Sequence, residues 1–356
     1  MKAPAEIGMR LEEVDTPALI LDLDAFETNL KRLAQAVRGR VRVRAHAKTH
    51  KCPEIARRQV AAGAVGVCCQ KVSEAEAMVE GGIADVLVSN EIVGARIGVC
   101  VDDADALREL QAAARRAAVT IDTYIELEVG MRRCGIAPGA PALELARAIV
   151  ASPGLRFAGL HAYHGRAQHI RAAQERRAVI QNSALLVKNT KALLKGTGID
   201  CPIVTGAGSG TFMFEVEQGA WDEIQPGSYV FMDWDYARNE WAPPMPRFEH
   251  SLFVLAGVMS RPGPALAIVD AGLKASSVDS GMPAVWERPG LSYTHASDEH
   301  GWVEIAPGAP APGLGDKLLL VPGHCDPTVN LYDWYVCVRG GVVEALWPIT
   351  ARGALT

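Results

Sequence analysis

The sequence predicts an α/β fold in which a (β/α)8 barrel is followed by a smaller β-rich domain. Short β-like runs alternate with helical patterns from about residue 40 to 235, the arrangement that builds a barrel of parallel strands. The helical pattern stops after about residue 245, and β-like runs with Gly and Pro turns continue to the C-terminus. The chain of 356 residues is also long enough for two domains. We expect residues 15–243 to form the barrel and residues 244–356 the second domain.

Eight runs are candidate barrel strands. They are residues 41–48, 65–70, 85–90, 97–101, 121–129, 157–163, 202–205 and 228–232. An earlier run, residues 18–23, is a ninth strand, and we expect residues 1–23 to contribute it to the second domain. Only residues 91–96 separate the third run from the fourth, whereas a parallel crossover needs about ten residues or more and usually a helix. We therefore expect a helix to be missing between Gly94 and Ile97, with a locally irregular barrel as the alternative.

Composition narrows the classes of function. Hydrophobic residues make up 49% of the chain and charged residues 22%, the balance of a globular protein with a sizeable core. The net charge is −5 without a basic cluster, which argues against nucleic-acid binding. The apolar runs are too short for a membrane span, and the first ten residues lack the apolar region of a secretion signal. Eight cysteines without a C-x-x-C pair indicate a reduced, cytoplasmic protein.

Lys48, at the end of the first barrel run, is the first chemical candidate. Residues 41–48 alternate apolar and basic side chains, so the apolar ones face the helices and the basic ones face the lumen. Lys48 falls at the C-terminal end of the strand, where barrels keep their chemistry. We expect the neighbouring cations to lower the pKa of its amine, giving the neutral amine that Schiff-base formation requires. A solvated lysine is the alternative, and Lys51 in the following loop is the rival residue.

A glycine-rich loop, residues 206–211, follows the seventh run. Its backbone N–H groups can converge on an anion, and the hydroxyls of Ser209 and Thr211 add donors. Loops after the last strands of a barrel often bind phosphate. Gly227 and Ser228, which open the next run, supply further donors. A flexible turn is the alternative, because the loop matches neither common nucleotide-binding pattern.

His324 and Asp326 form a candidate metal site in the second domain. In an extended segment residues i and i+2 point the same way, so both side chains can bind one ion while Cys325 points away. An imidazole and a carboxylate with open positions suit Mn²⁺, Mg²⁺ or Zn²⁺. A loop hydrogen bond is the alternative for such a pair. His164 and His169 follow the sixth run near the expected barrel mouth, where either can serve as a general base.

Several stretches together resemble the fold-type III pyridoxal-phosphate enzymes, and within them the family of D-threonine aldolase and 3-hydroxy-D-aspartate aldolase. The resemblance runs almost end to end. Its distinctive stretches are residues 15–24, 46–51, 67–75, 133–135, 162–169, 227–233, 270–274 and 322–328. Two departures are the short connection between Gly94 and Ile97 and a glycine loop that carries Ala207 and Ser209 in place of the usual glycine and threonine.

The resemblance implies an alanine racemase-like barrel and a role for each candidate residue. Lys48 forms the Schiff base with pyridoxal 5'-phosphate, and His169 is the base for the substrate hydroxyl. The residues expected around the cofactor ring are Gln70, Arg133 and Tyr163. Those expected at its phosphate end are Gly208, Ser209, Gly210, Gly227, Ser228 and Tyr236. His324 and Asp326 bind a divalent metal, with Mn²⁺ expected before Mg²⁺ or Zn²⁺, and the chain forms a homodimer.

The implied activity is a retro-aldol cleavage of D-β-hydroxy-α-amino acids. D-Threonine gives glycine and acetaldehyde, and 3-hydroxy-D-aspartate gives glycine and glyoxylate. The first alternative is a D-serine or 3-hydroxy-D-aspartate dehydratase of the same fold; the resembling dehydratases use His-x-Cys, whereas this chain has His324-x-Asp326. A racemase and a non-catalytic pyridoxal-phosphate carrier rank lower, because neither uses a metal pair in a second domain. For a substrate β-carboxylate, Arg166 is the candidate partner.

Overall fold

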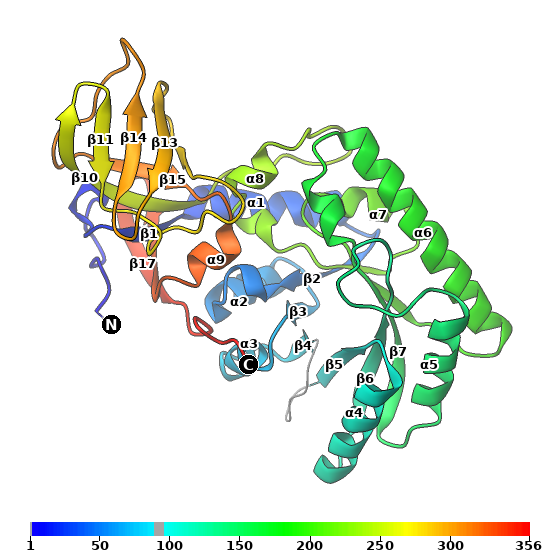
Figure 1. Cartoon of the computed structure of the whole chain (residues 1–356). Coiled ribbons are helices and arrows are strands. Elements are labelled where there is room, and N and C mark those ends of the chain that lie inside the picture. The colour runs from blue at the N-terminus through cyan, green and yellow to red at the C-terminus, as the bar shows by residue number, and fades with distance from the viewer. Residues whose placement is uncertain (1, 89–95) are drawn as a thin grey trace.

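The computed structural model describes residues 2–88 and 96–356, which form a closed parallel barrel beside a mixed β-sheet (Figure 1). Around the barrel the strands are β2 (Arg42–His46), β3 (Gly66–Cys69), β4 (Asp85–Val88), β5 (Arg96–Val101), β6 (Ile121–Glu126), β7 (Leu155–Ala162), β8 (Ile203–Gly206) and β9 (Glu223–Ile224). Every neighbouring pair is parallel, and β9 closes the ring on β2. The predicted barrel and the β-rich second domain are therefore confirmed.

Helices surround the barrel and connect successive strands (Figure 1). They are α1 (Leu23–Val37), α2 (Pro53–Ala61), α3 (Val72–Glu80), α4 (Ala104–Ala117), α5 (Ala140–Val150), α6 (Ala173–Gly196), α7 (Phe212–Gln218) and α8 (Trp234–Ala237). Short 3-10 turns are η1 (Leu11–Glu13), η2 (Ala47–Thr49), η3 (Gly165–His169) and η4 (Ser228–Val230). Within the described residues, no helix combines the length and the apolar composition that crossing a bilayer requires.

The second sheet is built mostly from the C-terminal part of the chain. Its strands are β10 (Leu252–Gly263), β11 (Leu266–Val269), β12 (Ala284–Val285), β13 (Leu291–Ala296), β14 (Gly301–Ile305), β15 (Lys317–Val321), β16 (Trp334–Arg339) and β17 (Val342–Pro348). The expected ninth strand, β1 (Ala18–Asp22), pairs with β10 and β16 in this sheet. The short helix α9 (Cys325–Val329) lies between the sheet and the barrel, packed against η2 (Figure 1). The exact domain boundaries stay a prediction.

Two expectations about the strands need comment. The eighth barrel strand is β9, and the predicted strand at residues 228–232 is wrong because that segment begins as the 3-10 turn η4. Its side chains from Tyr229 to Met232 are all buried, and such an apolar run does not distinguish a buried strand from a buried turn. The helix expected to be missing between Gly94 and Ile97 concerns a connection that lies outside the described residues.

The basic face of β2 does point into the lumen, where its central arginine has anionic partners. Arg44 is 6% exposed, and its guanidinium donates to Glu223 Oε1 at 2.9 Å and to Asp85 Oδ1 at 2.7 Å. A buried cation is tolerated only when it is paired in this way. These ion pairs direct the Arg44 guanidinium toward Glu223 and Asp85. Lys48 lies beyond the other end of β2, past His46.

Candidate active site

A single cavity at the C-terminal ends of the barrel strands brings the candidate residues together. Its volume is about 230 Å³, at the small end for ligand sites. Among the residues that line it are Lys48, Gln70, Arg133, Tyr163, His169, Gly208, Ser209, Gly227, Ser228, Tyr236, His324 and Asp326. Four other candidates do not line it: His164, Arg166, Gly210 and Thr211. The barrel and the second domain both contribute to this cavity.

Lys48 lies two residues beyond the end of β2, in η2, and forms an ion pair with Asp326 of α9. Burial acts to lower the pKa of the Lys48 amine, but Asp326 and Tyr163 outweigh it and raise that pKa. The expectation of a lowered pKa is wrong, because a carboxylate from the second domain faces the amine. The neighbouring His46 is partly buried, and burial followed by the charge of Lys48 lowers its pKa well below the usual value.

The rival lysine is engaged elsewhere. Lys51 is 6% exposed, and its Nζ donates to Glu74 Oε1 at 2.5 Å. It does not line the cavity. Lys48 is therefore the lysine available for chemistry in this cavity.

Two loops present hydrogen-bond donors to one end of the cavity. Ser209 Oγ accepts a hydrogen bond from Tyr229 N at 3.0 Å, which leaves its own proton free to be donated. A Cβ on Gly208 would lie 2.6 Å from Gln168 Oε1, and one on Gly227 would lie 2.4 Å from Thr49 Oγ1. A larger residue than glycine would therefore push the first loop away from Gln168 and the second loop away from Thr49.

Two donors predicted in the glycine loop are used inside the protein instead. Gly210 N donates to Gln168 Oε1 at 2.9 Å, and Thr211 Oγ1 donates to Glu215 Oε1 at 2.7 Å. Gln168 Nε2 in turn donates to Thr211 Oγ1 at 2.8 Å. Gly210 and Thr211 thus shape the loop without offering a donor to a ligand, which corrects the expectation for both. Burial raises the pKa of Glu215, behind the loop, to about 7.

Arg133 and Tyr163 lie together on another side of the cavity. The Arg133 guanidinium lies 5.7 Å from the centroid of the Tyr163 ring, and it is 3.7 Å from Glu126 Oε1. Burial raises the pKa of Tyr163. Gln70 also lines the cavity. The three residues predicted around the cofactor ring thus lie in one cavity. Glu126 supports the position of Arg133.

His169 is held by a carboxylate that the sequence did not indicate. Its Nδ1 lies 2.6 Å from Asp235 Oδ2, and Asp235 also accepts from Arg171 and Arg238. Burial acts to raise the pKa of Asp235, but hydrogen bonds from Arg171 and His169 outweigh it and lower that pKa. With Nδ1–H donated to an ionised carboxylate, Nε2 is the ring nitrogen left to accept a proton.

His324 and Asp326 are both at the cavity, but on a helix end and not on the predicted extended segment. His324 is the N-cap residue of α9, and Asp326 lies in its first turn. His324 Nδ1 is 2.8 Å from Asp279 Oδ2, so Nε2 is free to bind a cation. Asp326 Oδ1 is buried and has no hydrogen-bond partner among the described residues. Such an orphaned carboxylate oxygen beside a free imidazole nitrogen fits a divalent metal.

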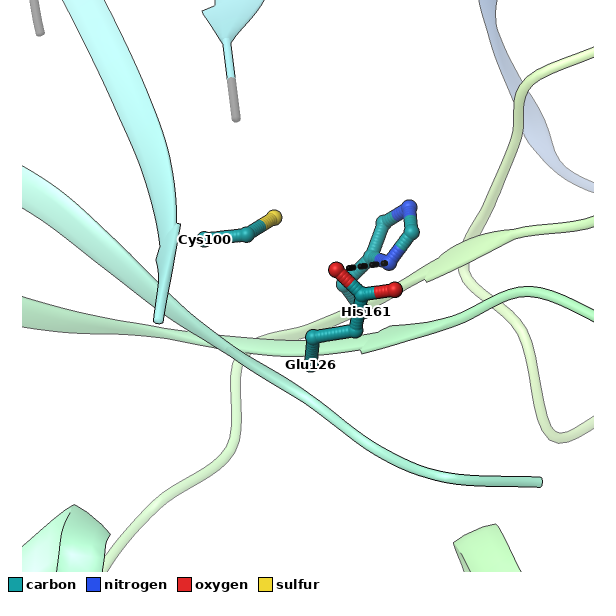
Figure 2. A group of neighbouring side chains, drawn as sticks. All are labelled: Cys100, Glu126 and His161. Atoms are coloured by element: carbon teal, nitrogen blue, oxygen red, sulfur yellow. Dashed lines mark ion pairs between the residues drawn. The ribbon is translucent and has the colours of Figure 1, made fainter. Parts of the chain in front are cut away.

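A second group of possible metal ligands was not predicted from the sequence. Cys100 on β5, Glu126 on β6 and His161 on β7 point toward one another inside the barrel (Figure 2), with ligand atoms within 4.8 Å of one another. Each sits on a barrel strand and lines the cavity. The available signal was the position of Glu126 and His161 near the ends of predicted strands. Asp235 lies in the short helix α8 and Asp279 in a turn, and neither carried such a signal.

Comparison with known proteins places this fold and cavity in one class. Residues 21–234 match the alanine racemase N-terminal domain, and residues 251–338 match a serine dehydratase domain. The class is therefore that of the alanine racemase-like barrels with a second domain of the dehydratase type.

Relatives along the whole chain narrow this class. A D-threonine aldolase from an Arthrobacter species is 50% identical, covering 98% of this chain and 96% of the relative. A 3-hydroxy-D-aspartate aldolase from Paracoccus denitrificans is 44% identical, covering 98% and 95%. The crystal structure of D-threonine aldolase from Filomicrobium marinum has a TM-score of 0.97 at 50% identity, covering 99% of this chain and 100% of that one. A Delftia D-threo-3-hydroxyaspartate dehydratase is 26% identical over 96% of each chain.

This chain belongs to the family of D-threonine aldolase and 3-hydroxy-D-aspartate aldolase, as the resemblance implied. The alignment with the Arthrobacter relative spans 364 residues, more than the 356 of this chain. That relative therefore has residues without a counterpart in this chain.

Proposed function

We propose that this protein is a pyridoxal-phosphate- and metal-dependent aldolase that cleaves D-β-hydroxy-α-amino acids. D-Threonine would give glycine and acetaldehyde, and 3-hydroxy-D-aspartate would give glycine and glyoxylate. The observation that carries the proposal is one cavity containing a lysine amine, a cluster of anion donors and an imidazole–carboxylate pair with an unpartnered oxygen. A cytoplasmic homodimer is part of the same proposal.

The residues of the cavity fit pyridoxal phosphate. Lys48 would hold it covalently, and Ser209 with the backbone of Gly208, Gly227 and Ser228 would bind its phosphate. Tyr236 lines the same end, and Gln70, Arg133 and Tyr163 would surround the ring. When bound, this cofactor supplies a ring that accepts the electron pair of the bond being broken. Gly210, whose N–H is already donated to Gln168, would act only on the shape of the loop.

His324 and Asp326 would hold the metal, for which Mn²⁺ is our first choice. Asp279 orients the imidazole so that Nε2 faces the cavity, and Asp326 Oδ1 is available as an oxygen ligand. A nitrogen and an oxygen ligand with open positions leave room for the substrate hydroxyl. A metal in contact with that hydroxyl lowers its pKa.

His169 would take the hydroxyl proton as the bond between the α and β carbons breaks. Asp235 accepts from Nδ1 and so directs Nε2 toward the cavity. The ion pairs of Asp235 with Arg171 and Arg238 keep it ionised, so it stabilises the protonated ring after the transfer. His169 is therefore proposed as the catalytic base and Asp235 as its positioning residue.

The charges of the cavity favour D-threonine over a substrate with a β-carboxylate. Arg166, our candidate partner for that carboxylate, does not line the cavity. Among the described lining residues the only arginine is Arg133, whose guanidinium lies 3.7 Å from Glu126. A second carboxylate would thus compete with Glu126 for the same cation.

The proposal is tested by the products that the protein makes. Protein supplied with pyridoxal phosphate and Mn²⁺ is offered D-threonine, L-threonine and 3-hydroxy-D-aspartate, with a chelator control. We expect glycine and an aldehyde from the D-substrates alone, lost on chelation, with D-threonine cleaved faster. Ammonia and a keto acid would make the protein a dehydratase, and absence of any product from cofactor-loaded protein would favour a non-catalytic carrier.

A further inference from the structure

Cys100, Glu126 and His161 form a cluster that the proposed reaction does not use. They come from three neighbouring strands, β5, β6 and β7, and meet inside the barrel (Figure 2). A thiol sulfur, a carboxylate oxygen and an imidazole nitrogen lie within 4.8 Å of one another. The cluster is separate from His324 and Asp326, which come from the second domain.

A chain of hydrogen bonds fixes which nitrogen of His161 carries the proton. Thr205 Oγ1 donates to Glu223 Oε1 at 2.9 Å, so it accepts the bond from Gln225 Nε2, also at 2.9 Å. The amide of Gln225 therefore turns its oxygen to His161 Nε2, at 3.1 Å. An amide oxygen only accepts, so Nε2 must donate. In the neutral ring the lone pair is then on Nδ1.

That lone pair points into the cluster without a partner. His161 is 8% exposed, and its Nδ1 is buried and makes no hydrogen bond among the described residues. The carboxylate oxygen nearest to Nδ1 is Glu126 Oε2, at 3.9 Å, and it is an acceptor too. A buried nitrogen acceptor that faces a half-buried carboxylate oxygen is satisfied by a proton or a cation between them. Arg133 contacts the other oxygen, Oε1, and leaves Oε2 free for this purpose.

The third member of the cluster decides between a proton and a metal ion. Cys100 brings a sulfur, and burial raises the pKa of its thiol well above the usual value, so it stays protonated unless a metal displaces the proton. Nitrogen, oxygen and sulfur ligands together are the set that Zn²⁺ prefers, at bond lengths of about 2.0–2.3 Å. The three ligand atoms, which lie within 4.8 Å of one another, would approach one another by side-chain rotation to reach that geometry.

We propose that Cys100, Glu126 and His161 bind a second divalent cation of the thiophilic class, Zn²⁺ or its substitutes Co²⁺ and Cd²⁺. Its fourth ligand position opens on the cavity that Lys48 lines. The site at His324 and Asp326 has only nitrogen and oxygen ligands, so the two sites differ in their metal preference. Binding at the cluster does not depend on the aldolase proposal and can be tested without substrate.

The experiment is a Co²⁺ titration of the full-length chain carrying His324→Ala, followed by absorbance. We expect one equivalent of Co²⁺ to give a thiolate-to-metal charge-transfer band. The band is lost in the added variant Cys100→Ser and kept in the matched variant Cys68→Ser, whose buried thiol also lines the cavity. If His161 and Glu126 share a proton and bind no metal, the His324→Ala chain shows no band, and this result overturns the proposal. A band that survives Cys100→Ser overturns it as well.

A second measurement starts from the unaltered chain. The unaltered chain loaded with ¹¹³Cd²⁺ is expected to show two resonances, one shifted by a sulfur ligand and one typical of nitrogen and oxygen ligands. Glu126→Gln should weaken the sulfur-shifted site by about tenfold or more and leave the other unchanged. A spectrum without a sulfur-shifted resonance contradicts the proposal, whatever the outcome of the product assay.

Discussion

Replacement of Asp279 by asparagine tests how the structure holds the His324 imidazole that we propose binds the metal. Asp279 Oδ2 lies 2.8 Å from His324 Nδ1, and Ser277 and Ser280 donate to the same carboxylate. Asp279→Asn keeps the size of the side chain but removes its charge. Loss of such a carboxylate behind a ligating histidine weakens metal binding by about 10- to 100-fold. The Asp279 side chain is 50% exposed, so water screens its charge and we expect the lower part of that range.

The assay is Mn²⁺ binding, followed through the electron paramagnetic resonance signal of the free ion. A tenfold loss corresponds to about 1.4 kcal/mol of binding free energy. The matched control is Asp200→Asn, which removes an exposed carboxylate just before β8 and should leave the affinity unchanged. Equal Mn²⁺ affinity in the Asp279→Asn protein and the unaltered protein would refute the view that this carboxylate orients His324.

Three further predictions concern the barrel and the glycine loop. Glu223→Ala leaves the buried Arg44 without its main partner and should lower the free energy of unfolding, measured by urea denaturation, by about 3–5 kcal/mol. A loss no larger than that caused by Glu299→Ala, which breaks an exposed ion pair, would contradict this. Burial raises the pKa of Glu215 from 4.5 to about 7, so between these pH values the carboxyl is protonated in the folded protein and ionised in the unfolded chain. The free energy of unfolding should therefore fall by about 3 kcal/mol as the pH rises from about 4.5 to about 7. Glu215→Gln should flatten the dependence between about pH 5 and pH 7.5, and an unchanged slope would contradict the assignment. Gln168→Ala removes the hydrogen-bond partner of Gly210 N and Thr211 Oγ1 and should weaken pyridoxal-phosphate binding, measured by absorbance, by about tenfold or more. The control Gln174→Ala, at an exposed position, should leave the affinity unchanged.

Local patterns were enough to predict the fold and several residues of the cavity, whereas Gln70, Arg133, Tyr163 and Tyr236 were expected only from the family resemblance. The alternation along residues 41–48 placed Lys48 at the lumen, and the glycine content of residues 206–211 placed donors after β8. Both predictions depend only on residues that are neighbours in the chain. Barrel topology then brings the strand ends together, which is why Tyr163 and Ser209 meet in one cavity without any sequence signal that links them.

The errors arose where distant segments decide the outcome. Lys48 and Asp326 are 278 residues apart in the chain, so no window of sequence could show that a carboxylate would raise the pKa of the amine. Gly210 and Thr211 have the residue types of a phosphate loop, yet Gln168 and Glu215 take their donors. Asp326 lies in a helical turn because α9 packs between the sheet and η2, which the H-x-D spacing alone does not reveal.

The most direct test of the central claim is to find which lysine holds the cofactor. Protein incubated with pyridoxal phosphate is reduced with borohydride, digested and analysed by mass spectrometry. The account predicts a single modified lysine, Lys48, and no modification of Lys51, whose amine is buried against Glu74. A label on Lys51, or none on Lys48 in cofactor-saturated protein, would contradict the assignment of this cavity as the active site.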